Sequence, residues 1–247
     1  MNFASLSVLD LSYNDFNSTL PPWLFSLTKL VTLEMHSTNL HRALPETFGS
    51  LTSLRMLDLS ENSNIEGQFP RCLGTLCSLQ TGSVPKSIGD LNSLEELYIS
   101  HNQMSGIISE SLGQPSSLTT LDISENTWEG SITEAHFMKL GSLREVEIYN
   151  TSPNISLVFD ISSDWIAPFR LRYLNIRSCQ PGPKFPTWLR NQTELVTLVL
   201  NNARISDTIP EWFWQLDFQL DQLDVAYNQL SGRVPNSLRF IEPAMLI

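Results

Sequence analysis

One apolar pattern repeats along almost the whole chain and limits what the chain can fold into. The pattern is L-x-x-L-x-L-x-x-N-x-L, followed by a small residue or glycine, a proline and a short apolar turn, as in "LRMLDLSENSNIEGQFPRCLGTLCS". A fixed period of roughly 20 to 50 residues is typical of solenoids, in which each coil stacks on its neighbours. Ten blocks begin at Leu6, Leu30, Leu54, Leu79, Leu94, Leu118, Leu143, Leu171, Leu195 and Leu220.

The first apolar residues of each block have the spacing of a β-strand. Leu57 and Leu59 point to one side, while Asp58 between them points to the other. The asparagine that follows, such as Asn62, carries donors and acceptors that can satisfy backbone groups where the chain turns. The proline then opens a convex segment. We therefore expect an α/β-type right-handed superhelix, with a parallel β-sheet on its concave face and short 3-10 turns and loops on its convex face.

Two blocks depart from the usual spacing of 24 or 25 residues. The fourth block, 79–93, has only 15 residues and lacks the nine that would supply the strand, the asparagine and the turn. The seventh block, 143–170, has 28 residues and is irregular. Because 15 residues cannot complete a coil, we predict about nine strands. The strand near Leu57–Ser60 should pair with that near Leu97–Ser100, with much of 80–93 extruded as a loop.

Charge and hydropathy narrow the possible partners. The 247 residues carry a net charge of −11 with only 15 Lys and Arg, which argues against nucleic acid, whose phosphates need clustered cations. No run approaches the roughly 18 apolar residues of a membrane span, and the N-terminus lacks the features of a signal peptide. Neither end carries a polar capping repeat. We expect one domain over 1–247, without membrane insertion of its own, that is a piece of a longer protein.

Motifs of catalysis and metal binding are absent from the sequence. G-x-S-x-G, H-E-x-x-H and phosphate-binding glycine loops do not occur, and the four histidines share no metal spacing. We therefore expect no enzymatic activity, no metal and no cofactor. Cys72 and Cys77 bracket a convex turn that would hold their Cα atoms about 10 Å apart. That separation exceeds the reach of a disulfide, so two separate thiols are favoured over a local bridge.

The outward-facing positions of the sheet remain as a surface for binding. Aromatic and arginine side chains are enriched at interface hot spots, and acidic side chains steer basic partners. For each of these residues taken singly, the alternative is a solvated polar position without a role in binding. The candidate ligand-binding residues are Tyr13, Glu34, Glu61, Tyr98, His101, Asp122, Glu125, Glu147, Tyr149, Tyr173, Arg177, Asn201 and Tyr227.

Four asparagines match the N-x-[ST] acceptor pattern for N-glycosylation, namely Asn17, Asn150, Asn154 and Asn191. Each match is weak alone, but together with the repeat type they favour the secretory pathway. Because Asn150 lies next to the predicted sheet, a glycan there would restrict that end of the concave face.

The turn after each strand carries a family resemblance. The segments "LDLSENSNIEGQFP" and "LDVAYNQLSGRVP" resemble the plant extracellular class of leucine-rich repeat, which the G-x-x-P turn marks. A narrower resemblance begins in the irregular block. The segments "SSDWIAPFRLRYLNIRSCQPGPKFPTWLRNQTEL" and "ISDTIPEWFWQL" resemble plant receptor-like proteins of the ethylene-inducing-xylanase receptor type.

That resemblance implies the ectodomain of a cell-surface immune receptor without a kinase domain, on the extracellular side of the plasma membrane. Such a receptor would bind an extracellular microbial protein or peptide on its concave face and signal through a receptor-kinase co-receptor. Two alternatives remain. One is a secreted inhibitor of a microbial wall-degrading enzyme, similar to the polygalacturonase-inhibiting proteins. The other is a truncated product without function.

Overall fold

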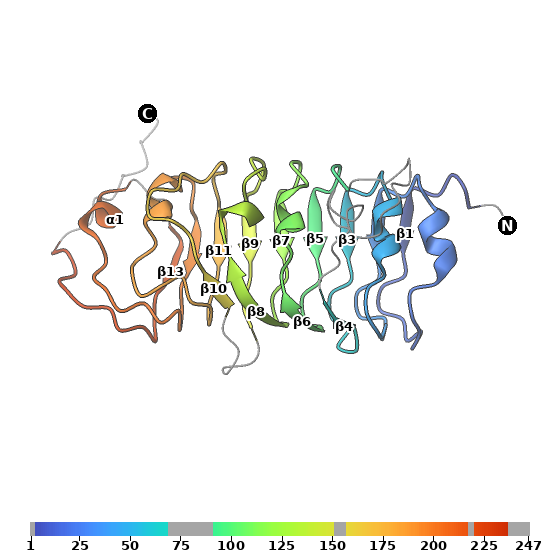
Figure 1. Cartoon of the computed structure of the whole chain (residues 1–247), viewed down its shortest axis with the longest axis horizontal. Helices are drawn as coiled ribbons and strands as arrows, with labels where there is room; N and C mark the ends of the chain where they lie inside the picture. The colour runs from blue at the N-terminus through green and yellow to red at the C-terminus, as the bar shows by residue number, and fades with distance from the viewer. Residues whose placement is uncertain (1–2, 69–90, 151–156, 217–219, 237–247) are drawn as a thin grey trace, which may run out of the picture.

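The chain winds into an elongated array of coils whose strands line one face (Figure 1). The computed structural model describes residues 3–68, 91–150, 157–216 and 220–236. Nine strands form one sheet in the order β1-β2-β3-β5-β7-β9-β11-β12-β13, with every pair parallel. They are β1 Val8–Asp10, β2 Thr32–Glu34, β3 Met56–Asp58, β5 Glu96–Tyr98, β7 Thr120–Asp122, β9 Glu145–Glu147, β11 Tyr173–Asn175, β12 Thr197–Val199 and β13 Gln222–Asp224.

Alternation along each strand divides core from concave face, as predicted. The central residue points inward, and Leu33, Leu57, Leu97 and Leu121 are buried. The residues on either side point outward. The register pairs equivalent positions of successive coils, so that Asp58 lies beside Tyr98 and Tyr98 beside Asp122. The outward side chains therefore form straight columns across the sheet.

The repeat asparagine holds each coil to the one before it, as Asn62 shows. Its buried amide nitrogen donates to three backbone carbonyl oxygens, and its amide oxygen accepts from two backbone N–H groups. The partners of the nitrogen are Met35, Leu59 and Ser60, and those of the oxygen are Thr38 and Leu40. Buried backbone groups that leave a strand need such partners, which explains the asparagine in this position.

The short fourth block is bypassed in the sheet. β3 pairs directly with β5, with Leu57 beside Leu97 and Asp58 beside Tyr98. The backbone N–H of Leu59 also donates to the Tyr98 carbonyl oxygen at 2.9 Å. The predicted pairing is therefore confirmed. Cys72, Cys77 and the predicted loop up to residue 90 lie outside the described residues.

A second parallel sheet runs beside the first, and the repeat pattern did not predict it. Its order is β10-β8-β6-β4 (Figure 1). The strands are β4 Glu66–Gly67, β6 Gln103–Ile107, β8 Thr127–Ile132 and β10 Leu157–Phe159. These segments follow the repeat asparagine, where we expected only turns and loops. Gly106 and Gly130 adopt φ values of 86° and 83°, which favour glycine over any side chain.

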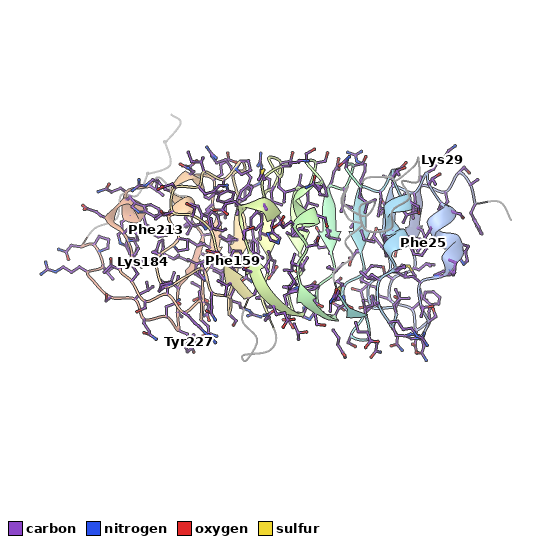
Figure 2. The ribbon with its side chains drawn as sticks, in the orientation of Figure 1. Phe25, Lys29, Phe159, Lys184, Phe213 and Tyr227 are labelled. Atoms are coloured by element: carbon purple, nitrogen blue, oxygen red, sulfur yellow. The ribbon has the colours of Figure 1, made fainter. Side chains whose placement is uncertain are left out.

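Short helical turns form the convex face, as expected. They are the 3-10 turns η1 Pro22–Ser26, η2 Glu46–Ser50, η5 Glu110–Gly113, η6 Glu134–His136 and η7 Thr187–Asn191, with one α-helical turn, α1 Glu211–Gln215. Pro21, Pro45, Pro186 and Pro210 stand at N-caps of these turns. Apolar side chains from the turns, among them Leu24 and Phe48, close the core. Phe213 of α1 is another (Figure 2).

Candidate functional site

A row of side chains projects from the ends of the concave strands. The residue just before the repeat asparagine position adopts a left-handed backbone, which is rare for residues other than glycine. It recurs with φ between 50° and 57° at Tyr13, Ser37, Glu61, His101, Glu125, Ser178, Asn202 and Tyr227. The shared conformation aims these side chains alike, so the row forms one edge of the concave face.

Asn150 holds the corresponding place in the seventh block, but its side chain turns inward. Its amide oxygen accepts from the Trp128 backbone N–H at 2.9 Å, and its amide nitrogen donates to the Trp128 carbonyl oxygen at 2.7 Å. Asn150 is therefore only 6% exposed. Between Glu125 and Ser178 the row lacks a projecting side chain, and the surface is hollowed there.

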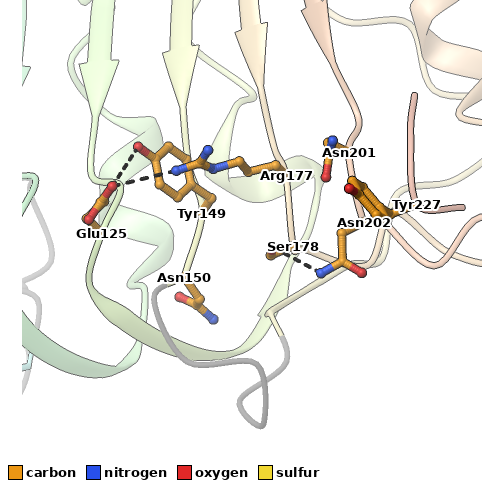
Figure 3. Close-up of a pocket in the computed structure, with 8 residues that line it drawn as sticks. All are labelled: Glu125, Tyr149, Asn150, Arg177, Ser178, Asn201, Asn202 and Tyr227. Atoms are coloured by element: carbon orange, nitrogen blue, oxygen red, sulfur yellow. Dashed lines mark hydrogen bonds and ion pairs between the residues drawn. The ribbon is translucent and has the colours of Figure 1, made fainter. Parts of the chain in front are cut away.

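The resulting depression, called here the concave hollow, has a volume of about 570 Å³ (Figure 3). This size falls within the range of roughly 300 to 1,000 Å³ that is usual for small-ligand sites. Its lining residues come from five successive coils in the C-terminal half of the sheet: Glu125, Tyr149, Asn150, Arg177, Ser178, Asn201, Asn202 and Tyr227.

One wall of the concave hollow is a charged and aromatic cluster around Glu125. The carboxylate accepts a hydrogen bond from the Tyr149 hydroxyl at 3.2 Å and pairs with the Arg177 guanidinium at 3.6 Å. Its other oxygen lies 3.2 Å from Nδ1 of His101. The Arg177 guanidinium also stacks over the Tyr149 ring, 4.1 Å from the ring centre. Arg177 is thus held in place while its side chain stays about half exposed.

The opposite wall is uncharged and carries a free aromatic face. Asn202 donates to the Ser178 hydroxyl at 3.2 Å, and the amide nitrogen of Asn201 donates to both oxygens of Asp224, at 3.1 and 2.9 Å. Beyond them Tyr227 is 84% exposed. This wall therefore offers amide oxygens and a broad ring to a ligand.

Carboxylates gather on the strands beside the hollow. Glu147 accepts from the Asn175 amide at 2.8 Å, and its pKa is raised, chiefly by burial and then by the charge of Asp122. Burial and the nearby Glu96 raise the pKa of Tyr98 to about 12. Asp122 uses one oxygen to accept from the Ser124 backbone N–H and hydroxyl, at 3.0 and 2.6 Å. Asp122 therefore stabilises the end of its own strand.

The structure divides the predicted binding residues into three groups. Five line the concave hollow: Glu125, Tyr149, Arg177, Asn201 and Tyr227. The columns beside it contain Tyr98, His101, Asp122, Glu147 and Tyr173. Tyr13, Glu34 and Glu61 belong to the N-terminal coils at the far end of the sheet.

Sequence reasoning missed three lining residues. Ser178 and Asn202 stand at outward positions of the repeat, but nothing in their small polar side chains singled them out. Asn150 was predicted as a glycosylation acceptor at an outward position of the sheet, which is wrong as to its direction. Its inward turn places it on the floor of the hollow, and the amide nitrogen that would carry a glycan is hydrogen-bonded to Trp128.

The other glycosylation acceptors differ in access. Asn17 is exposed, with a φ of 44°. Asn191 is half-buried at the end of η7. Asn154 lies outside the described residues.

In the ranges that the structure describes, no three His, Cys, Asp or Glu side chains gather closely enough to hold a metal ion. No helix in the described part of the chain has the length and apolar character to cross a membrane.

The stacked coils, the asparagine ladder and the concave sheet are those of a leucine-rich-repeat ectodomain. The chain belongs to the leucine-rich repeat family: the family model described as "Leucine-rich repeat region" matches residues 1–208. The tomato (Solanum lycopersicum) protein "Receptor-like protein EIX1" is 40% identical over 103 residues, covering 41% of this chain and 10% of that protein. "Receptor-like protein 39" of Arabidopsis thaliana is 31% identical, covering 94% of this chain. The resemblance to plant receptor-like proteins is confirmed.

Solved plant ectodomains share the fold. The ectodomain of the Arabidopsis thaliana membrane receptor kinase GASSHO1/SCHENGEN3, in complex with CASPARIAN STRIP INTEGRITY FACTOR 2, superposes with a TM-score of 0.73 at 25% identity, over 94% of this chain and 28% of that one. The Arabidopsis receptor kinase HAESA, in complex with the peptide hormone IDA and the co-receptor SERK1, gives 0.61 at 26% identity, over 96% and 40%. The chain spans about a tenth of EIX1 and 32% of Receptor-like protein 39.

Proposed function

We propose that this chain is a ligand-binding part of the ectodomain of a plant cell-surface receptor-like protein in defence signalling. Its ligand is an extracellular microbial protein or peptide that binds on the concave face. The observation that carries the proposal is the concave hollow, which joins a held arginine and two tyrosines at one place on the sheet. Arginine and tyrosine are the residue types most enriched at interface hot spots.

The geometry around Arg177 suits recognition of a macromolecule. Glu125 and the Tyr149 ring fix the guanidinium before any ligand arrives. A side chain that is already ordered loses less conformational entropy on binding, so more of its contact energy appears as affinity. The acidic columns beside the hollow would accelerate encounter with a basic surface.

The relatives support a cell-surface setting for this site. Receptor-like protein names and the HAESA complex with a peptide and a co-receptor support a location on the extracellular side of the plasma membrane. They also support signalling through a receptor-kinase co-receptor. The chain itself acts as a non-enzymatic binding module in this proposal.

Binding to purified microbial enzymes tests the proposal. The full chain, secreted from plant cells, is immobilised and exposed to a fungal endo-xylanase and a fungal polygalacturonase, both produced without glycans in bacteria. We expect the xylanase to bind and R177A to weaken binding at least tenfold. Y13A, at the position of the first coil that corresponds to Tyr227, should change it less than twofold. Slowed polygalacturonase turnover would instead indicate the inhibitor, and failure to bind either enzyme would overturn the proposal.

A further inference from the structure

The concave hollow is more polar than a usual ligand pocket. Such pockets are lined predominantly by hydrophobic and aromatic side chains, with a small number of polar groups. The hollow instead presents a carboxylate, a guanidinium, three amides and a hydroxyl, and its exposed aromatic ring is that of Tyr227, because Arg177 covers the Tyr149 ring. Such a lining matches a ligand that is rich in hydroxyl groups and has one apolar ring face.

Charge inside the hollow is balanced. Glu125 and Arg177 pair with each other at 3.6 Å, so the wall that they form has no net charge. The chain around it is acidic, with a net charge of −11, and nearby the pKa of Glu147 is raised by burial and by the charge of Asp122. An anionic ligand would meet this repulsion, whereas a neutral ligand would not.

Hydrogen-bonding groups remain available on both walls. The amide nitrogen of Asn201 is bound to Asp224, which fixes its carbonyl oxygen as an acceptor toward a ligand. Asn202 uses one amide hydrogen on Ser178 and keeps its oxygen and second hydrogen. Arg177 contributes only one of its terminal nitrogens to the Glu125 pair. Donors and acceptors thus surround the space beside the Tyr227 ring (Figure 3).

We propose that the concave hollow is a subsite for a neutral saccharide. One sugar ring stacks its C–H face on Tyr227, and its hydroxyl groups bind Asn201, Asn202 and the Glu125–Arg177 pair. The saccharide is either a free wall oligosaccharide or a glycan carried by a protein ligand, since both offer the same chemistry. This inference rests on the proposed role of the concave face in ligand binding, and it names the class of ligand that the hollow accepts.

Saccharide titration tests the inference directly. Saturation-transfer NMR and calorimetry on the full chain use xylohexaose, cellohexaose and N-acetylchitohexaose as free probes. Ribonuclease B, which carries a neutral glycan, is compared with ribonuclease A, the same protein without it. Binding of a free oligosaccharide identifies a wall glycan as the source, and binding of ribonuclease B alone identifies a protein-borne glycan.

Matched variants locate the binding. We expect Y227A to weaken saccharide binding at least tenfold, about 1.4 kcal/mol, and R177A to weaken it as well. Y13A is the control, because Tyr13 has the same left-handed backbone and is 78% exposed, but it lies at the other end of the sheet. Circular dichroism melting checks that each variant is folded.

Two results would overturn the saccharide subsite. One is the absence of binding to every saccharide and to ribonuclease B. The other is binding that Y227A and Y13A leave equally strong. If the unglycosylated xylanase binds while every saccharide fails, the saccharide inference is wrong and the receptor proposal stands.

Discussion

At the scale of single residues, the repeat asparagines concentrate many backbone hydrogen bonds on one side chain. Asn62 is fully buried and serves five backbone groups of its own coil and the preceding one. Asn14 has the same place in the first coil but is exposed and serves only two carbonyl groups. The two asparagines therefore allow a buried and an exposed residue at the same repeat position to be compared.

Replacement of Asn62 by alanine should destabilise the fold strongly. Buried donors and acceptors that lose their partners each cost about 1–3 kcal/mol, so we expect N62A to lower the free energy of unfolding by about 3 kcal/mol or more. N14A should cost under about 1 kcal/mol, because water can replace its hydrogen bonds. Urea unfolding measures both. Equal losses in the two variants would contradict this role of burial.

Glycan occupancy should follow the access of the asparagine side chains. On the chain secreted from plant cells, we expect glycopeptide mass spectrometry to find Asn17 modified and Asn150 unmodified. The Asn150 amide nitrogen is buried and bonded to Trp128, whereas Asn17 is exposed. A glycan at Asn150 in the folded protein would show that the seventh coil opens there and that the hollow is shielded.

The Glu147 carboxylate should make stability depend on pH. Its pKa is raised in the folded state from the ordinary value of 4.5, mainly by burial, so folding favours the protonated form. The charged form is a disadvantage at neutral pH, and this disadvantage disappears as pH falls below the ordinary value. We therefore expect E147Q to raise the melting temperature at pH 7 and to leave it nearly unchanged at pH 4.

Glutamine can still accept the Asn175 hydrogen bond, so E147Q tests charge rather than geometry. E129Q removes the same charge from an exposed side chain and serves as the control. Stabilisation by E147Q that is equally large at pH 4 and pH 7 would argue against the titration of Glu147 as its source.

At the scale of elements, the convex turns pack backbone against backbone. Gly113 ends η5, and a Cβ atom added there would lie 2.5 Å from the Ala135 carbonyl oxygen in η6. Gly141 is a contrasting position, where the nearest atom to such a Cβ, the Pro168 carbonyl oxygen, is 3.8 Å away.

Alanine at these two glycines should have different effects. We expect G113A to destabilise the chain by about 1–3 kcal/mol, because the turns must move apart to admit the methyl group. G141A should be neutral or slightly stabilising, since it restricts only the unfolded chain. Thermal unfolding of both variants checks the contrast, and an unchanged melting point for G113A would mean that η5 and η6 can separate freely.

The strands of the main sheet could be predicted from sequence, and those of the second sheet could not. Leu57 and Leu97 sit in a period-two apolar pattern, so their strands and their pairing follow from burial alone. β6 and β8 contain Gly106 and Gly130 with positive φ and lack that alternation. Their pairing arises only because stacked coils bring equivalent turns side by side, which is a tertiary effect.

The concave hollow was only partly predictable for a similar reason. The outward columns follow from the repeat frame, and they supplied Arg177, Tyr149 and Tyr227. The depression itself depends on the inward turn of Asn150, which stands one position before the expected asparagine in the irregular block. The repeat pattern assigns one role to each position. It could therefore not predict that Asn150 makes the inward hydrogen bonds expected of the next position.

At the scale of the whole molecule, the question is whether the short fourth block divides the array. Across β3 and β5 the Leu59 and Glu61 N–H groups donate to Tyr98 and Ser100, at 2.9 and 3.0 Å. Across the regular β5–β7 junction the corresponding hydrogen bonds, from Ile99 and His101, measure 2.9 and 3.2 Å. The sheet therefore crosses the shortened coil with the same backbone geometry as elsewhere.

Amide exchange should report one continuous array. In a solenoid each coil is stabilised mainly by its neighbours, so a weak junction would let the coils on one side open without the others. We expect the Leu59 and Glu61 amides to exchange as slowly as those of Ile99 and His101, within about tenfold, by hydrogen–deuterium exchange NMR. Tenfold corresponds to about 1.4 kcal/mol in opening free energy. If residues 3–68 instead exchange as a separate block, far faster than 91–150, loss of the fourth strand has uncoupled the N-terminal coils from the half of the sheet that contains the hollow.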